Sequence, residues 1–286
     1  MRKLTTILAC AMLTMSMAAC GINFEGFNSK RVTASKNYVT KQFNLSDFNK
    51  ISMAGSMDVY FTQRPGNPEV SVVTSDNIVD LLDVYVEDNT LYIKFKKGYT
   101  IIKRDKLDFT IGAADLNKMS LAGSGDFKLM NGLTTEDLNM SIAGSGDILC
   151  DNINSTGNVK LSISGSGDIE SKSILCKELT TSIAGSADIK VLGIDAQAVK
   201  ANISGSGDFK LDGKTKSASY SIAGSGDIDA DELIAEDVTA HISGSGEITC
   251  YASESIKATR SGSGEIGYKG NPTTVDVSKK GVHPIN

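Results

Sequence analysis

Eight carboxylates recur at a nearly constant spacing between residues 126 and 265 of this 286-residue chain. Each stands three residues after a glycine, in the phrase Gly-Ser-Gly-Asp or a close variant: Asp126, Asp147, Asp168, Asp188, Asp208, Asp227, Glu247 and Glu265. Such a column can hold cations, or it can accept hydrogen bonds from N–H groups of its own turns. We favour the structural role, because one carboxylate per repeat supplies far fewer oxygens than Ca²⁺ prefers. No metal or other cofactor is therefore expected.

A second polar column lies three residues before the same glycines and consists mostly of serine. His241 interrupts it, with Ser221 and Thr259 at the equivalent positions of the neighbouring repeats. A Ser-His-Asp arrangement is conceivable there, but no nucleophile elbow or oxyanion-hole motif accompanies these residues. We therefore predict a structural column and no catalytic residues.

A third column, five residues after the glycines, mixes both signs of charge and has no row of aromatic residues. It reads Lys128, Leu149, Glu170, Lys190, Lys210, Asp229, Thr249 and Gly267. Polysaccharide-cleaving β-helices need clustered carboxylates and basic residues on one lateral face, so this composition disfavours such an activity.

The glycines that define these columns form an internal repeat. They follow one another at nearly even steps, and they stand at Gly123, Gly144, Gly165, Gly185, Gly205, Gly224, Gly244 and Gly262. A ninth copy stands apart, much earlier in the chain, at Gly55. Large apolar residues precede each glycine by two positions, except at Arg260, and follow it by four. Each copy therefore reads as a strand, a tight glycine corner and a second strand.

One such unit cannot bury its apolar face alone, whereas stacked units can. A period of about 20 residues predicts an all-β chain that forms a parallel β-helix, in which each strand pairs with its equivalent one rung away. The crossover rule predicts a right-handed helix. Eight rungs at the usual strand spacing give a rod about 35–40 Å long.

The chain ends differ from the repeat. Residues 43–118 are expected to form the first rung and an N-terminal β cap, with a hairpin at Asp88-Asn89 and one helical turn near residues 76–82. Residues 119–268 hold the β-helix repeats. Residues 269–286 are expected to form a C-terminal cap or tail, in which Val275 and Val277 close the last rung.

Two features test this register. Arg260 takes an inward position that is apolar in every earlier rung, so it should reach solvent through an open last rung or pair with a carboxylate such as Glu247 or Glu265. Cys150 and Cys250 share an inward column five rungs, or about 24 Å, apart. That distance is too long for a disulfide bond.

The first residues read as a targeting segment. Residues 1–19 have a basic start and an apolar stretch, as in a signal peptide, and the "MAAC" that ends at Cys20 resembles the lipobox of bacterial lipoproteins. Cys20 is therefore predicted as the lipid-attachment site, with ordinary secretory cleavage as the alternative. Residues 20–42 are expected to form a lipidated tether. A lipid at this cysteine would anchor the chain to a membrane without spanning it.

Three features together resemble a family of Bacteroidetes lipoproteins called putative auto-transporter adhesins, head GIN domain. "GIN" follows the anchor cysteine at residues 21–23, "SDNIVDLLDVYVEDNTLYIKF" has the family's cap pattern, and the serial "GSGD/E" rungs follow. The resemblance covers residues 43–268. It implies a β-helix like that of pectin lyases without their catalytic residues.

These observations predict a non-enzymatic, lipid-anchored protein of the cell envelope. It is expected in the outer membrane, with either the periplasmic or the cell surface as the side that it faces. Its expected role is adhesion or binding of a surface ligand, either protein or glycan. The mild net charge of −5 gives no indication of a nucleic-acid partner. Two alternatives stay open: a structural scaffold that self-associates, and a degenerate polysaccharide-acting β-helix enzyme.

Overall fold

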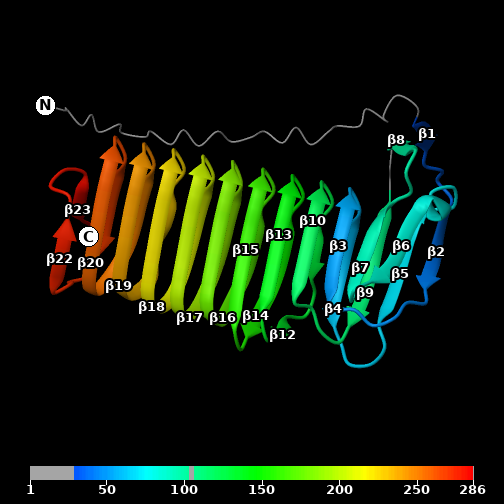
Figure 1. Ribbon diagram of the computed structural model, residues 1–286, viewed down its shortest axis with the longest axis horizontal. Coiled ribbons are helices and arrows are strands. Elements are labelled where there is room, and N and C mark those ends of the chain that lie inside the picture. The colour runs from blue at the N-terminus through cyan, green and yellow to red at the C-terminus, as the bar shows by residue number, and fades with distance from the viewer. Residues whose placement is uncertain (1–28, 103–105, 286) are drawn as a thin grey trace, which may run out of the picture.

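The computed structural model describes residues 29–102 and 106–285. In this part of the chain, coils of about 20 residues stack in parallel into a β-solenoid of about eight turns (Figure 1). The stack runs from a cap that contains β2 (Tyr38–Phe43) to the last coil, which contains β20 (Glu247–Gly262). The predicted all-β parallel β-helix is confirmed.

The glycine corners align through the whole stack. β3 (Lys50–Gly55) pairs in parallel with β10 (Lys118–Gly123), which places Gly55 beside Gly123. The same alignment continues through the later coils, whose strands are β13 (Leu138–Gly144), β15 (Asn158–Gly165), β16 (Ile169–Gly185), β17 (Asp188–Gly205), β18 (Asp208–Gly224), β19 (Ile228–Gly244) and β20. The distant first copy of the repeat is therefore the first of these stacked corners, and the residues between it and the second copy complete that coil and form the cap on its far side.

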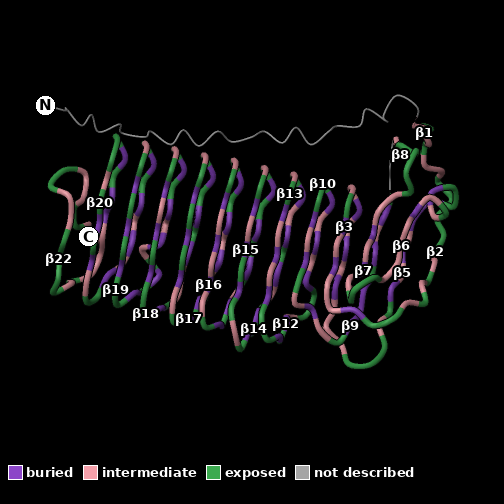
Figure 2. Tube along the Cα trace, viewed as in Figure 1, coloured by how far each residue is buried: buried purple, intermediate pink, exposed green. Residues whose placement is uncertain are grey.

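Each coil has three extended faces, whereas the sequence predicted two strands per repeat. Within one face of β17, buried residues alternate with exposed ones. At two bends, the spacing from one buried residue to the next lengthens from two positions to three. The buried side chains of this coil thus fall into three groups: Ile189 and Val191; Ile194 and Ala196; Val199, Ala201 and Ile203. The longer step keeps apolar side chains inward where the chain changes direction. Figure 2 shows the resulting alternation along every coil.

The glycine corner leaves no room for a side chain. Gly165 has a φ of +143°, and a Cβ placed on it would collide with the carbonyl oxygen of Gly144 in the preceding coil. The same collision with the preceding corner recurs at every glycine of this column from Gly123 to Gly262. Glycine is thus required both by the backbone dihedral angle and by the close approach of the neighbouring coil.

The N-terminal cap begins with one further rung. β7 (Thr90–Phe95) pairs in parallel with β3, and β9 (Leu107–Ala113) pairs in parallel with β4 (Asp58–Gln63). Beyond this rung the pairing becomes antiparallel: β6 (Leu82–Glu87) pairs with β7, and β5 (Glu69–Ser75) pairs with β9. The predicted hairpin is present between β6 and β7, with positive φ at Asp88 and Asn89. The predicted helical turn is a short 3-10 helix at Val79–Leu81.

The segment expected to be a tether is partly folded. Its described residues contain β1 (Lys30–Thr33) and most of β2, and β2 pairs antiparallel with β5. β1 pairs in parallel with β8 (Tyr99–Ile102). The correction has a simple reason: β5 would otherwise present a free edge, and "YVTKQF" has the extended, β-branched and aromatic character that can cover it.

The remaining strands complete the coils. β11 (Phe127–Leu129), β12 (Leu133–Thr135) and β14 (Ile148–Ser155) belong to the early rungs, and β21 (Glu265–Lys269) to the last. Beyond β21, β22 (Thr274–Val277) stacks on β20 and β23 (Val282–Pro284) stacks on β21. The C-terminal segment therefore extends the stack by a partial coil. Val277 packs against the core, whereas Val275 is 48% exposed.

Arg260 is accommodated without the expected carboxylate. Its Nη1 donates a hydrogen bond to the carbonyl oxygen of Gly264 at 2.8 Å, and its guanidinium lies so close to Gly281 that a Cβ there would collide with it. Within the described residues, no ion pair joins it to Glu247 or Glu265. The residue is half-buried, so solvent and a backbone carbonyl together replace the apolar neighbours of earlier rungs.

The corner can be tested by adding a single methyl group. Gly165→Ala should lower the free energy of unfolding by about 3 kcal/mol or more, because backbone strain and a collision with Gly144 add together. Gly66→Ala is the matched control, since Gly66 also has positive φ but open space around it. Chemical denaturation should show a much smaller loss for the control, and equal losses would contradict the close approach of the coils.

Candidate functional site

The acidic column forms a continuous series of hydrogen bonds along the solenoid. Oδ1 of Asp168 accepts a hydrogen bond from the backbone N–H of Asp188 at 2.9 Å, and Oδ1 of Asp188 accepts one from Asp208 at 3.1 Å. Equivalent bonds run without a break from Asp58 to Glu247. The expected acceptor role is present, but the expected donor is wrong: it belongs to the next coil rather than to the carboxylate's own turn.

The donor lies in the next coil because parallel stacking directs the corner N–H groups along the solenoid axis. The series ends where aspartate gives way to glutamate. The N–H of Glu265 donates to the carbonyl oxygen of Gly246 at 3.2 Å, not to Glu247. Glutamate is one methylene longer, which moves its carboxylate away from the position that aspartate holds.

Opposite charges pair between coils on the outer surface. Lys190 lies 2.9 Å from Glu170, and Lys210 lies 2.8 Å from Asp229. The mixed signs of the third column are thus paired in part from one coil to the next. Surface pairs of this kind contribute little stability each.

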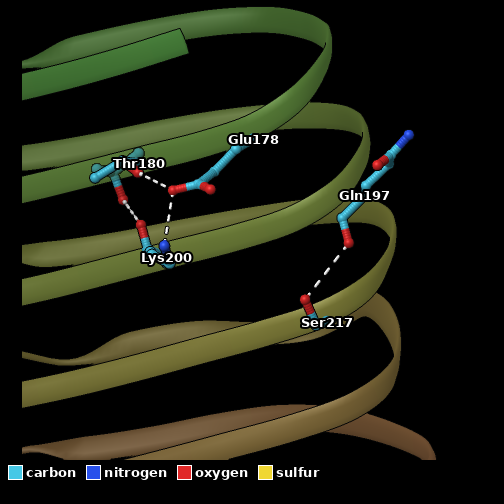
Figure 3. Close-up of polar contacts among 6 residues, drawn as sticks. Glu178, Thr180, Gln197, Lys200 and Ser217 are labelled. Carbon is cyan, nitrogen blue, oxygen red and sulfur yellow. Dashed lines mark hydrogen bonds and ion pairs between the residues drawn. The ribbon is translucent and has the colours of Figure 1, made fainter. Parts of the chain in front are cut away.

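A further pair lies on another face, near Thr180. Lys200 donates to Glu178 at 2.8 Å, and Thr180 donates to the same carboxylate at 3.1 Å (Figure 3). The hydrogen bond from Lys200 is the main reason that the pKa of Glu178 is lowered. Figure 3 also shows Ser217 donating to the carbonyl oxygen of Gln197 in the preceding coil. These groups join adjacent coils, which indicates a structural role.

His241 contacts Thr259, its neighbour in the same column. Its Nδ1 lies 2.9 Å from Oγ1 of Thr259, and the contact is exposed. The serine column instead bonds to itself, as between Ser182 and Ser162 at 3.1 Å. Within residues 29–102 and 106–285, no three His, Cys, Asp or Glu side chains gather so that they could hold a metal ion.

A groove lies on the face of the solenoid to which Ile194 and Ala196 belong in β17. It carries exposed apolar residues that the sequence analysis missed. This Leu175 groove, about 580 Å³ in volume, is lined by Leu175, Asp195, Lys214, Ile234 and Glu236 among others. Leu175 is 47% exposed and Ile234 is 52% exposed. The sequence signal was an apolar residue out of phase, since Leu175 stands between the inward-facing Ile174 and Cys176.

The two apolar residues of the Leu175 groove flank an ion pair. Leu175, Asp195, Lys214 and Ile234 occupy successive positions of one outward column, one in each of four coils. Lys214 lies 3.0 Å from Asp195. Leu175 and Ile234 are therefore about 14 Å apart, with a charged centre between them.

A second groove, about 540 Å³ in volume, is polar. Asp115, Glu136 and Asp137 line it together with several asparagines. Asp137 accepts the N–H of Asn158 at 2.7 Å, and Asp115 accepts the N–H of Leu116 at 2.8 Å. Two of its three carboxylates are thus occupied by backbone donors.

The three cysteines of the solenoid are buried and unpaired: Cys150, Cys176 and Cys250. Burial raises the pKa of Cys150 and of Cys250 to about 12, and that of Cys176 to about 11. Cys150 and Cys250 are thus free thiols of the core, as their shared inward column predicted. Cys20, the predicted lipid site, lies outside the described residues, as does the segment before it.

Comparison with known proteins identifies the family. The family model described as putative auto-transporter adhesin, head GIN domain, matches residues 47–172 and 152–272. The chain belongs to this family, as its cap and repeat motifs predicted. No curated protein matches it. No helix within the described residues is long and apolar enough to cross a membrane.

Solved structures of similar proteins share the fold. A putative adhesin from Bacteroides fragilis is 32% identical, with a TM-score of 0.53, over 89% of this chain and 98% of that one. A putative lipid binding protein from Parabacteroides distasonis is 25% identical, with a TM-score of 0.62, over 90% and 100%. A putative adhesin from Parabacteroides merdae has a TM-score of 0.70 at 23% identity, over the same shares.

Removing one carboxylate tests the acidic column. Asp168→Ala leaves the N–H of Asp188 without its acceptor and should lower the free energy of unfolding by about 1–2 kcal/mol. Asp168→Asn keeps an oxygen acceptor and should cost less. A chelator should leave the melting temperature of the unaltered protein nearly unchanged. A large drop on chelation would show instead that the column holds cations.

Proposed function

We propose that this protein is a lipid-anchored adhesin of the outer membrane, attached through Cys20, which binds a protein or glycan ligand along the side of its solenoid. Family membership supports a surface-binding role, and the lipobox-like sequence supports the anchor. The proposal assigns no catalytic residue. The carboxylates of the polar groove that are bound by backbone N–H groups serve as turn acceptors.

The observation that carries the binding role is the Leu175 groove. Leu175 and Ile234 expose about half of their surface on faces that are otherwise polar. Two apolar residues around a charged pair supply both contact area and orientation for a ligand, as binding surfaces usually do. The groove lies on the flank of the solenoid, in coils distant from the N-terminal cap, so a membrane-attached cap would leave it accessible.

Anchoring and surface display can be tested on cells. Radiolabelled palmitate should enter the unaltered protein and should not enter Cys20→Ala. Protease added to intact cells should degrade the unaltered protein, because an adhesin must face outward. Palmitate labelling without proteolysis would keep the anchor but place the protein on the periplasmic side, which contradicts the adhesin role.

The Leu175 groove can be tested by making it polar. Binding of the full-length protein to arrays of immobilised glycans and extracellular-matrix proteins should fall about tenfold in Leu175→Ser/Ile234→Ser, as expected for the loss of central apolar contacts. Met130→Ser/Leu149→Ser is the matched control, since both residues are exposed and lie on another groove. Equal losses in both variants, or none in either, would contradict the assignment.

Self-association is a second candidate, favoured by the C-terminal end. Val275 stacks on Ile256 of the preceding coil, yet no later strand covers it in the described residues. An incomplete coil with a free strand edge can accept a further strand. Sedimentation of the full-length protein should then show association that Val275→Lys reduces. A monomer at all concentrations would remove this candidate.

A further inference from the structure

The β1–β8 ribbon stands apart from the rest of the fold. β1 and β8 form a sheet of their own, separate from the sheet that contains all other described strands. Figure 1 shows them at the edge of the cap, above β6 and β2. A ribbon of two short strands gains little stability from its own hydrogen bonds. Its position outside the core suggests a role on the surface.

The ribbon, together with the residues that lead into β8, is basic and carries no acidic residue. Residues 29–33 and 96–102 contain four cations and neither Asp nor Glu: Lys30, Arg31, Lys96 and Lys97. All four are exposed. Lys96 donates to the carbonyl oxygen of Asp80, whose carboxylate lies 3.4 Å from Lys41. The side chains of Lys30, Arg31 and Lys97 form no ion pair with any described residue, so their charges are available to a partner.

Apolar and aromatic side chains lie among these cations. Paired residues of neighbouring strands share one side of a sheet, so one side of the ribbon carries Lys30, Val32, Tyr99 and Ile101. Tyr99 is 37% exposed, and Val32 and Ile101 are only half-buried. Tyrosine beside lysine is typical of segments at the headgroup level of a bilayer. Arg31 pairs with Thr100 and adds its charge at the other side of the ribbon.

The position of the ribbon along the chain connects it to the anchor. Nine residues lead from Cys20 to Ser29, which directly precedes β1, and they can span at most about 30 Å. With a lipid on Cys20, the ribbon is the first described element after the membrane. The chain as a whole has a net charge of −5, so most of it is repelled by an anionic membrane while the ribbon is attracted.

We propose that the β1–β8 ribbon docks on the anionic headgroups of the bilayer that holds the anchor, and thereby turns the cap of the solenoid toward the membrane. The inference rests on the proposed lipid attachment at Cys20. The partner of the ribbon is the phospholipid surface. The cations are distributed over the ribbon rather than gathered in a pocket, and its apolar side chains are only partly exposed, which suits contact with a flat surface of headgroups. This orientation directs the coils and the Leu175 groove away from the membrane.

Lysine footprinting on vesicles tests this docking. Full-length lipidated protein is added to preformed vesicles of phosphatidylcholine, with or without phosphatidylglycerol, and the acetylation rate of each lysine is measured by mass spectrometry. Lys30 and Lys97 should react severalfold more slowly on the anionic vesicles, and high salt should abolish the difference. Lys257, which is exposed and unpaired within the described residues, is the control and should react equally on both.

A variant separates docking from anchoring. In Arg31→Gln/Lys97→Gln, Lys30 should lose its protection on anionic vesicles, whereas Lys257→Gln should leave that protection intact. Equal rates at Lys30 on both vesicle types, with the protein still floating on them, would overturn the docking and keep the anchor. Failure to float on phosphatidylcholine vesicles would overturn the anchor, and the docking with it.

Discussion

The close approach of successive glycine corners is the constraint on which the rest of this structure depends. From Gly123 to Gly262, the Cα of each corner faces the carbonyl oxygen of the corner before it, so no Cβ fits. The corner therefore fixes the register of every coil against its neighbour. A slip of one residue would turn the apolar side chains outward and the polar ones inward. All columns described above follow from this one register.

The fixed register determines what the outer surface can do. Because equivalent residues lie one strand spacing apart, each aspartate of the acidic column reaches the N–H of the next coil. Lysines and carboxylates in adjacent coils meet in the same way. Most polar groups along these columns are thus committed to holding coils together. The candidates for binding are then side chains outside these columns of bonds: the exposed Leu175 and Ile234, and the cations of the β1–β8 ribbon.

Much of the fold could be predicted from the sequence, because aligning the glycines of the repeat shows which residues of successive coils lie side by side. The alignment of Gly55 with Gly123 followed from shared columns despite the long segment of chain between them. The third face could not be predicted in this way, since its bends carry varied residues and show only as a longer step between apolar positions. The strands β1 and β2 were missed because pairing with a cap edge leaves no periodic signal in the tether.

The candidate sites show the same division. The acidic column was evident from its spacing, but the donor in the next coil depends on stacking geometry that one repeat does not contain. Leu175 and Ile234 could have been recognised as apolar residues out of phase, yet their presence in one groove depends on four coils in register. The sequence shows the basic residues of the ribbon, but it gives no sign that β1 and β8 pair into a sheet separate from the core.

Disulfide trapping tests the central register most directly. Ser162 and Ser182 face each other across adjacent coils, with their hydroxyl oxygens 3.1 Å apart, and Asn202 follows one coil later. In Ser162→Cys/Ser182→Cys, mild oxidation should form a disulfide that peptide mapping detects. In Ser162→Cys/Asn202→Cys, the two Cα atoms are about 10 Å apart, beyond disulfide reach, and no bond should form. A bond in the second variant and none in the first would contradict the register and the account built on it.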